Sequence, residues 1–174
     1  MEPHSQLPDG VSREQGFVML QDNDFFLSCD PHLKKYEAKG DVTEPQLPGS
    51  VNAQGSTKSY EVTDELENIP KGIWGSTVVS TYEFTNIEYG VFSRVKSPLG
   101  VVINTRWEIK EGDDGKLDLV QAAEISCSKP LMSLVKGRCE AGCEYLLFIF
   151  RSELDFSIGK TRLLGHSLQV VDQY

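Results

Sequence analysis

Four successive segments alternate apolar and polar side chains, and this alternation constrains the fold more than any other feature of the sequence. They span residues 76–84, 91–96, 101–110 and 117–127. A period of two is typical of a strand that buries one face. The turn at 112–115 has the sequence Gly-Asp-Asp-Gly, which is a strong hairpin signal. Together with a further alternating segment at 58–63, these residues predict an antiparallel meander with one apolar face.

A second periodicity follows the meander. From Pro130 onward, apolar residues such as Leu131, Leu146 and Phe150 recur at the spacing of one helix face. Proline is well suited to a first helical turn. The pattern predicts a long helix over about 129–154, which is the one predicted element large enough to cover the sheet. The sequence therefore predicts an α+β fold in which a curved antiparallel sheet wraps around a long C-terminal helix, the helix-grip arrangement.

We expect three parts in the chain: an N-terminal tail at 1–10, a ligand-binding domain at 11–154 and a C-terminal extension at 155–174. The sequence leaves the structure of the extension open, with a terminal strand as one alternative. Ser12 and Gln15 have the spacing of a capping box and predict the start of a helix. Before the meander we expect a second short helix around 25–27, a short strand at 33–38 and a mobile loop at 41–58.

The composition excludes several classes of partner. The 174 residues carry 17 Lys and Arg against 26 Asp and Glu, a formal net charge of −9, so nucleic acid and anionic membranes would repel the chain. The longest apolar run, Tyr145–Phe150, is far short of the roughly 20 residues that span a bilayer. We expect a cytoplasmic protein without stable membrane insertion. The four cysteines are expected to be reduced, buried thiols, and we expect neither a metal nor a cofactor.

The alternation also assigns the face of the sheet that the helix should cover. On that face we expect ligand-binding side chains from several strands, namely Tyr60, Ser80, Phe84, Thr105, Trp107 and Gln121. Their mixture suits an apolar ligand that a few hydrogen bonds orient. The alternative is that these residues simply fill a core, although hydroxyl and amide groups in a closed core are costly. Trp74, in the connection at 64–75, is a candidate contact at the cavity entrance or else a packed anchor of that loop.

Catalytic candidates are fewer. The chain has no nucleophile elbow, zinc-protease motif or phosphate-binding glycine loop. The strand carboxylates Glu61, Glu83, Glu108 and Glu124 are expected on the solvated face of the sheet. A bulge that turned one of them inward would raise its pKa and make it a general acid or base. Glu83, with the neighbouring Tyr82, is the favoured catalytic pair. His32 could face the cavity mouth, although a histidine after a short helix more often caps a turn.

Several segments resemble a fungal START-like family of uncharacterised proteins. The similar residues are Leu7-Pro8-Asp9-Gly10-Val11-Ser12-Arg13-Glu14, Gly75-Ser76-Thr77, Tyr82-Glu83-Phe84, Ser97-Pro98-Leu99-Gly100, Trp107, and Cys127-Ser128 before Leu131-Met132. The resemblance covers about residues 7–147 and implies the START/polyketide-cyclase helix-grip fold. The wider superfamily includes lipid carriers, hormone receptors, aromatase/cyclases and hydrolases, so the fold alone does not choose an activity.

These observations predict a protein that binds a polyketide-, terpenoid- or lipid-like molecule in an internal cavity. Catalysis of cyclisation, isomerisation or hydrolysis by proton transfer, in fungal secondary metabolism, is one expectation within that function. A non-catalytic carrier of lipids or other small molecules is the alternative. The expected partner is the hydrophobic ligand, and the sequence leaves a homodimer open.

Overall fold

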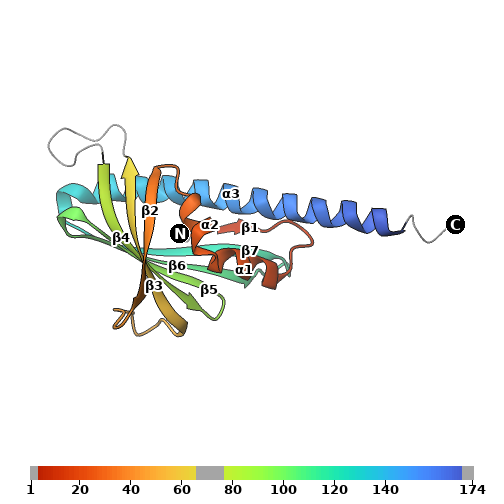
Figure 1. Ribbon diagram of the computed structural model, residues 1–174, viewed down its shortest axis with the longest axis horizontal. Coiled ribbons are helices and arrows are strands. Elements are labelled where there is room, and N and C mark those ends of the chain that lie inside the picture. Colours follow the sequence, from red (N-terminus) through yellow and green to blue (C-terminus); the bar gives the residue numbers. More distant parts are fainter. Residues whose placement is uncertain (1–3, 66–76, 170–174) are drawn as a thin grey trace.

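The computed structural model describes residues 4–65 and 77–169, which form one curved antiparallel sheet and a long helix that runs across it (Figure 1). Seven strands lie in the order β1-β7-β6-β5-β4-β3-β2. The α+β, helix-grip prediction is confirmed. The elements are β1 (His4–Gln6), α1 (Arg13–Gln21), α2 (Asn23–Ser28), β2 (Leu33–Val42), β3 (Ala53–Glu65), β4 (Thr77–Ile87), β5 (Gly90–Ser97), the 3-10 turn η1 (Pro98–Gly100), β6 (Val101–Glu111), β7 (Leu117–Ser126) and α3 (Lys129–Gln169).

The first described residues are not a loose tail. Residues 4–6 form β1, which pairs antiparallel with β7. Leu7 follows and is buried in the core, and its backbone N–H donates to the carbonyl oxygen of Leu117 at 2.7 Å. A three-residue strand is too short to display a clear alternation, so the sequence pattern missed it.

Both short helices are present, and the first begins at the predicted capping box. The Ser12 hydroxyl accepts from the Gln15 backbone N–H at 3.2 Å, and the Gln15 side chain accepts from the Ser12 N–H at 2.8 Å. This reciprocal capping box satisfies two amides at the start of α1. The Asp22 carboxylate accepts from the Phe25 N–H at 3.0 Å and caps α2 in the same way. The two helices carry Leu20 and Leu27 into the core.

Strands β2 and β3 are longer than predicted, and the loop between them is correspondingly shorter, at 43–52. The loop folds against the outer face of the sheet instead of standing free. The Arg94 guanidinium donates to the Gln46 carbonyl at 2.9 Å, and Arg106 donates to the Ser50 carbonyl at 3.2 Å. Such contacts join residues about 50 positions apart, so the local composition of the loop did not predict them.

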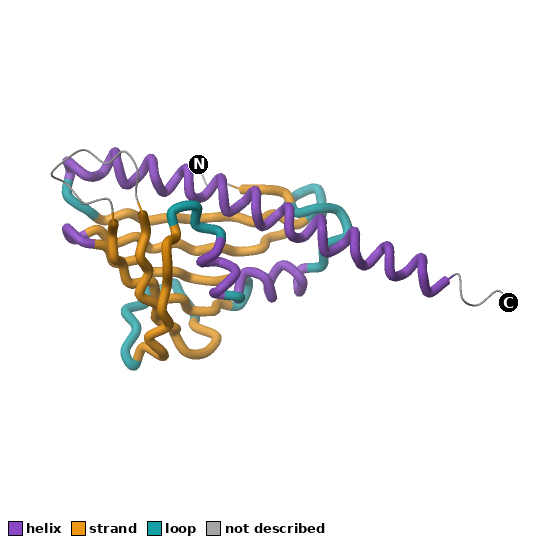
Figure 2. The backbone as a smooth tube through the Cα atoms, turned by 45° about the horizontal axis from the view of Figure 1, so that its top comes forward, coloured by secondary structure: helices purple, strands orange, loops and turns teal. Residues whose placement is uncertain are grey.

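Helix α3 continues to Gln169, so the predicted end near residue 154 and the alternative of a terminal strand are both wrong. The C-terminal turns of the helix project past the edge of the sheet (Figure 2). The glycines within α3 do not end it, because a glycine inside a helix costs only about 1 kcal/mol relative to alanine. Within the described residues, no helix combines the length and apolar character needed to cross a membrane.

Two separate clusters of apolar side chains lie between α3 and the sheet. The larger one joins α1 and α2 to the sheet and to the middle of α3, with Phe84, Trp107, Leu146 and Phe150 among its members. The smaller one, around Val101, Leu131 and Val135, lies at the start of α3. Because the core is divided in this way, the interior between the clusters is not filled by packed side chains.

Candidate functional site

A cavity of about 240 Å³ occupies the space between the two clusters. Its walls come from the covered face of β3–β7, from the turn after α2 and from the first half of α3. Apolar side chains dominate these walls; among them are Val78, Val95, Ile103, Trp107, Val135 and Leu146. This volume is somewhat smaller than that of most small-molecule pockets, which enclose about 300–1,000 Å³. The cavity can therefore receive a compact apolar ligand.

Hydroxyl and amide groups interrupt the apolar wall. Ser80, Thr105 and Gln121, which the alternation predicted to face inward, all line the cavity and are buried. Ser93 and Ser97 line it as well, and the Ser80 and Ser97 hydroxyls are hydrogen-bonded at 2.7 Å. The structure thus places these residues where a ligand would contact them. Their role in ligand binding stays a prediction.

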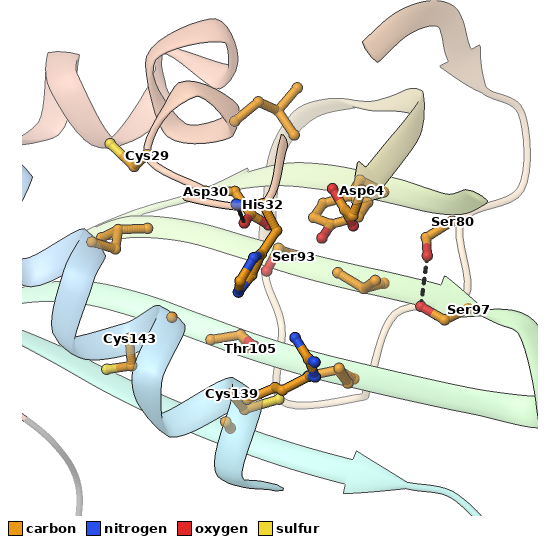
Figure 3. A pocket seen from close by; sticks show the side chains of 18 of the residues that line it. Cys29, Asp30, His32, Asp64, Ser80, Ser93, Ser97, Thr105, Cys139 and Cys143 are labelled. Atoms are coloured by element: carbon orange, nitrogen blue, oxygen red, sulfur yellow. Dashed lines mark hydrogen bonds between the residues drawn. The ribbon is translucent and has the colours of Figure 1, made fainter. Parts of the chain in front are cut away.

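One side of the cavity is acidic. The turn after α2 contributes Asp30 and His32, and the end of β3 contributes Asp64. The Asp30 carboxylate accepts from the His32 backbone N–H at 2.8 Å, and the His32 carbonyl accepts from the Glu65 N–H at 2.9 Å. These bonds fix the turn against the end of β3. In Figure 3, Asp30, His32 and Asp64 lie along one side of the pocket, opposite the thiols of α3.

Asp64 is the unusual member of this group. Its side chain is 7% exposed, and its Oδ1 atom is buried without a hydrogen-bond partner in the described part of the chain. Burial, and secondarily the negative charge of Asp30, raise the pKa of the Asp64 carboxyl to about 7. The group is therefore close to half ionised at neutral pH and can either accept or release a proton there.

Tyr82 and Glu83, the favoured catalytic pair, lie on opposite faces of β4. Tyr82 lines the cavity; burial and then the charges of Asp64 and Asp30 raise the pKa of its phenol well above the usual value, so it stays protonated. Glu83 is buried on the outer face, where its carboxylate pairs with the Lys96 ammonium at 2.6 Å. The register of β4 with β5 is regular from Thr81 to Ile87, so no bulge turns Glu83 inward. The structure does not bring Glu83 to the cavity.

The remaining predicted residues separate into lining and packing roles. Trp107 lines the cavity. Phe84 is a fully buried core residue whose ring packs against Phe26 at 5.4 Å between centroids. The Tyr60 hydroxyl accepts from the Asn23 amide at 3.3 Å, and its ring packs against Phe84. Neither Tyr60 nor Phe84 is among the lining residues, so core packing explains both. Trp74 lies outside the described residues.

Sequence reasoning missed the acidic side and the α3 wall. Asp64 falls in the predicted connection, although it continues the alternation of Tyr60 and Val62 by one step, and that continuation was the available signal. Arg138 has the spacing of the solvated side of α3 but lines the cavity with Cys139. The other lining residues of α3 follow the same apolar periodicity as residues that pack in a core. The pattern therefore could not distinguish lining residues from core residues.

The buried thiols are poor nucleophiles on electrostatic grounds, because the thiolate is the reactive form. Burial is the main cause that raises the pKa of Cys29, Cys139 and Cys143 to about 11. These groups stay protonated at neutral pH and act as small apolar side chains. Within residues 4–65 and 77–169, no group of three or more His, Cys, Asp or Glu side chains is placed to hold a metal ion.

Comparison with known proteins relates the chain to others by fold and by family. A crystal structure of TTHA0849 from Thermus thermophilus matches with a TM-score of 0.55 and 14% identity, over 90% of this chain and 96% of that chain. At this identity the match shows a shared fold. No curated protein matches the chain significantly. Residues 2–148, from before β1 to the middle of α3, match the model of a family described as a domain of unknown function, DUF7053. The match covers most of the chain, with the whole sheet and every residue that lines the cavity, so the chain belongs to the DUF7053 family.

Proposed function

We propose that this protein binds a hydrophobic small molecule, polyketide-, terpenoid- or lipid-like, in the cavity between the sheet and α3. The observation that carries the proposal is the presence of buried hydroxyl and amide groups on the wall of an unfilled apolar space. Such groups are unfavourable in a closed apolar core, at about 1–3 kcal/mol for each one buried without a partner. The Ser80 and Ser97 hydroxyls partner each other, so the proposal depends on the other polar groups of the wall, Thr105 and Gln121 among them. A ligand that meets them explains why they are there.

We also propose that the protein belongs to a START-like family, is of fungal origin and is located in the cytoplasm. Membership of a START-like family is supported by the helix-grip fold and by the sequence segments that resemble it, and fungal origin is supported by that resemblance alone. A cytoplasmic location is supported by four free cysteines, which a reducing compartment preserves. These properties suit a protein that receives apolar metabolites inside the cell.

A second candidate function is catalysis of proton transfer on the bound ligand without a cofactor, as in cyclisation, isomerisation or hydrolysis. It is favoured by one specific observation, that Tyr82 and Asp64 both line the cavity. A neutral phenol donates a hydrogen bond, and a carboxyl with a pKa near 7 is suited to general acid–base chemistry at neutral pH. The carrier function requires only the cavity, so it comes first.

Binding of the fluorescent amine 1-aminoanthracene, together with native mass spectrometry of the protein purified from its host, tests the proposal. Ala123→Phe introduces a bulky ring on the cavity side of β7, whereas Ala122→Phe introduces the same ring on the outer face of that strand. We expect wild type and Ala122→Phe to bind the probe saturably. Ala123→Phe should lower the affinity for the probe at least tenfold. Absence of any retained apolar molecule, or equal binding by both variants, would contradict the proposal.

A further inference from the structure

We propose that the cavity selects an apolar ligand that carries an ammonium group, which Asp64 binds, and that it discriminates against ligand carboxylates. The inference rests on the proposed function and adds the polar chemistry of the ligand. It derives from the acidic side of the cavity, formed by Asp30 and Asp64.

The first step is the availability of Asp64. Its side chain is more than nine-tenths buried, lines the cavity, and has an Oδ1 atom without a hydrogen-bond partner among the described residues. Asp30 differs, since its Oδ1 already accepts from the His32 backbone N–H at 2.8 Å. A buried acceptor that lacks a donor is unfavourable, so a donor on the ligand would stabilise it.

The second step is the sign of the charge. Asp64 lies on the same side of the cavity as Asp30, and their mutual repulsion contributes to the raised pKa of Asp64. A ligand ammonium placed between them would relieve this repulsion and pair with a desolvated carboxylate. A ligand carboxylate at the same position would add a third negative group. The cavity is therefore suited to a cationic end group on this side.

Other titratable groups face the same space and define the controls. His32 extends from the turn beside Asp30, Tyr82 comes from β4, and Arg138 and Cys139 come from α3 on the opposite wall. The phenol and the thiol stay neutral because the pKa of each is raised. His32 carries a titratable ring, so a His32→Asn variant must accompany the pH measurements.

The third step predicts a pH dependence. With a carboxyl pKa near 7, Asp64 is about one-tenth ionised at pH 6 and about nine-tenths ionised at pH 8. An alkylammonium keeps its proton over this range, as a lysine side chain does. Because the ammonium binds the ionised carboxylate, its affinity should rise about tenfold from pH 6 to pH 8.

Isothermal titration of the full chain with octylammonium, 1-octanol and octanoate at pH 6, 7 and 8 tests the inference. We expect octylammonium to bind at least tenfold more tightly than octanoate at pH 8, with the tenfold rise described above. Asp64→Asn should remove that rise and weaken octylammonium binding at least tenfold, while 1-octanol binding changes less than threefold. Glu108→Gln, which changes a carboxylate on the outer face of β6, and His32→Asn should both retain the rise.

The outcomes separate this inference from the proposed function. Suppose that 1-aminoanthracene binds saturably, but that the affinity for octylammonium is unchanged by Asp64→Asn or by pH. The inference is then overturned, whereas the proposed apolar cavity is not. Tighter binding of octanoate than octylammonium overturns it as well. If 1-aminoanthracene and all three octyl probes fail, the proposed function fails. Should Asp64→Asn not fold, carboxyl NMR of wild type provides the test, and an unchanged Asp64 titration midpoint with octylammonium overturns the inference.

Discussion

At the scale of single residues, two acidic side chains that look alike in the sequence have opposite environments. Glu83 and Asp64 both belong to strands, and both are 7% exposed. Glu83 lies on the outer face with an ammonium 2.6 Å away, whereas Asp64 lies on the cavity face, where the negative charge of Asp30 contributes to its raised pKa. The pairing partner, not the burial, decides which of the two is suited to bind a ligand or move a proton.

The raised pKa of Asp64 predicts how stability depends on pH. A carboxyl with a pKa near 7 when folded and about 3.9 when unfolded binds more protons in the folded state between those values, so its contribution to stability falls as pH rises towards 7. Replacement by asparagine removes this loss, which amounts to at most about 4 kcal/mol. In urea unfolding, Asp64→Asn should therefore gain stability relative to wild type from pH 5 to pH 8. A constant difference across that range would contradict the prediction.

The ion pair of Glu83 predicts a structural effect. Lys96→Met leaves a buried carboxylate without its ammonium, so we expect a loss of about 1–3 kcal/mol in the free energy of unfolding, moderated because the lysine side chain is 40% exposed. Glu140→Gln, which breaks the exposed Lys136–Glu140 pair on α3, is the control and should cost at most about 0.5 kcal/mol. Denaturant titration measures both, and equal losses would argue against a structural role for the Glu83 pair.

At the scale of elements, the sequence predicted what depends on neighbours in the chain. The capping box of Ser12 and Gln15 and the alternation of β4, β6 and β7 depend on local spacing, and both are present in the structure. The alternation also placed Ser80, Thr105 and Gln121 on the cavity side. Residues far away in sequence determine three other features. These are the early start of β3, the position of the loop that Arg94 holds, and the pairing of β1 with β7. Such contacts leave no local pattern, and they account for most of the differences.

Two glycines provide a matched test at this scale. A methyl group on Gly90, the first residue of β5, would overlap the backbone carbonyl of Trp107 on β6, whereas one on Gly137 in α3 would meet open space. Gly90→Ala should destabilise the fold by about 1–3 kcal/mol or more. Gly137→Ala should stabilise it by about 0.5–1 kcal/mol, because alanine favours helix. Thermal unfolding compares the two, and a shift of the same sign in both would contradict the close approach at Gly90.

At the scale of the whole molecule, the fold creates a cavity by dividing its core. One cluster anchors the middle of α3 through α1 and α2, and another anchors its start, so the helix is held at two places above the sheet. The sequence predicted an internal cavity but not its acidic side, because the turn carrying Asp30 meets β3 only in the folded chain. The candidate site was thus predictable where strands form it, whereas on the turn that completes it only His32 was expected near the cavity.

Two leucines of α3 separate binding from stability across the molecule. Both belong to the larger cluster, but Leu146 also lines the cavity, whereas Leu154 lies two turns further on and is not among the lining residues. Replacing either leucine by alanine should lower the free energy of unfolding by about 2–4 kcal/mol. Only Leu146→Ala enlarges the cavity, so it alone should shift the preference from octylammonium towards dodecylammonium in a competition measured by native mass spectrometry. The same shift in Leu154→Ala would show that the effect is not local to the cavity.

The three residues of β1 have a consequence for the exterior of the sheet. They occupy the hydrogen-bonding groups of β7 from Asp118 to Val120, which would otherwise be an open edge. Unpaired edges recruit strands from other molecules and promote aggregation. Removal of the first six residues would expose these groups of β7. Recombinant versions shortened at this terminus should therefore self-associate more readily than the intact chain.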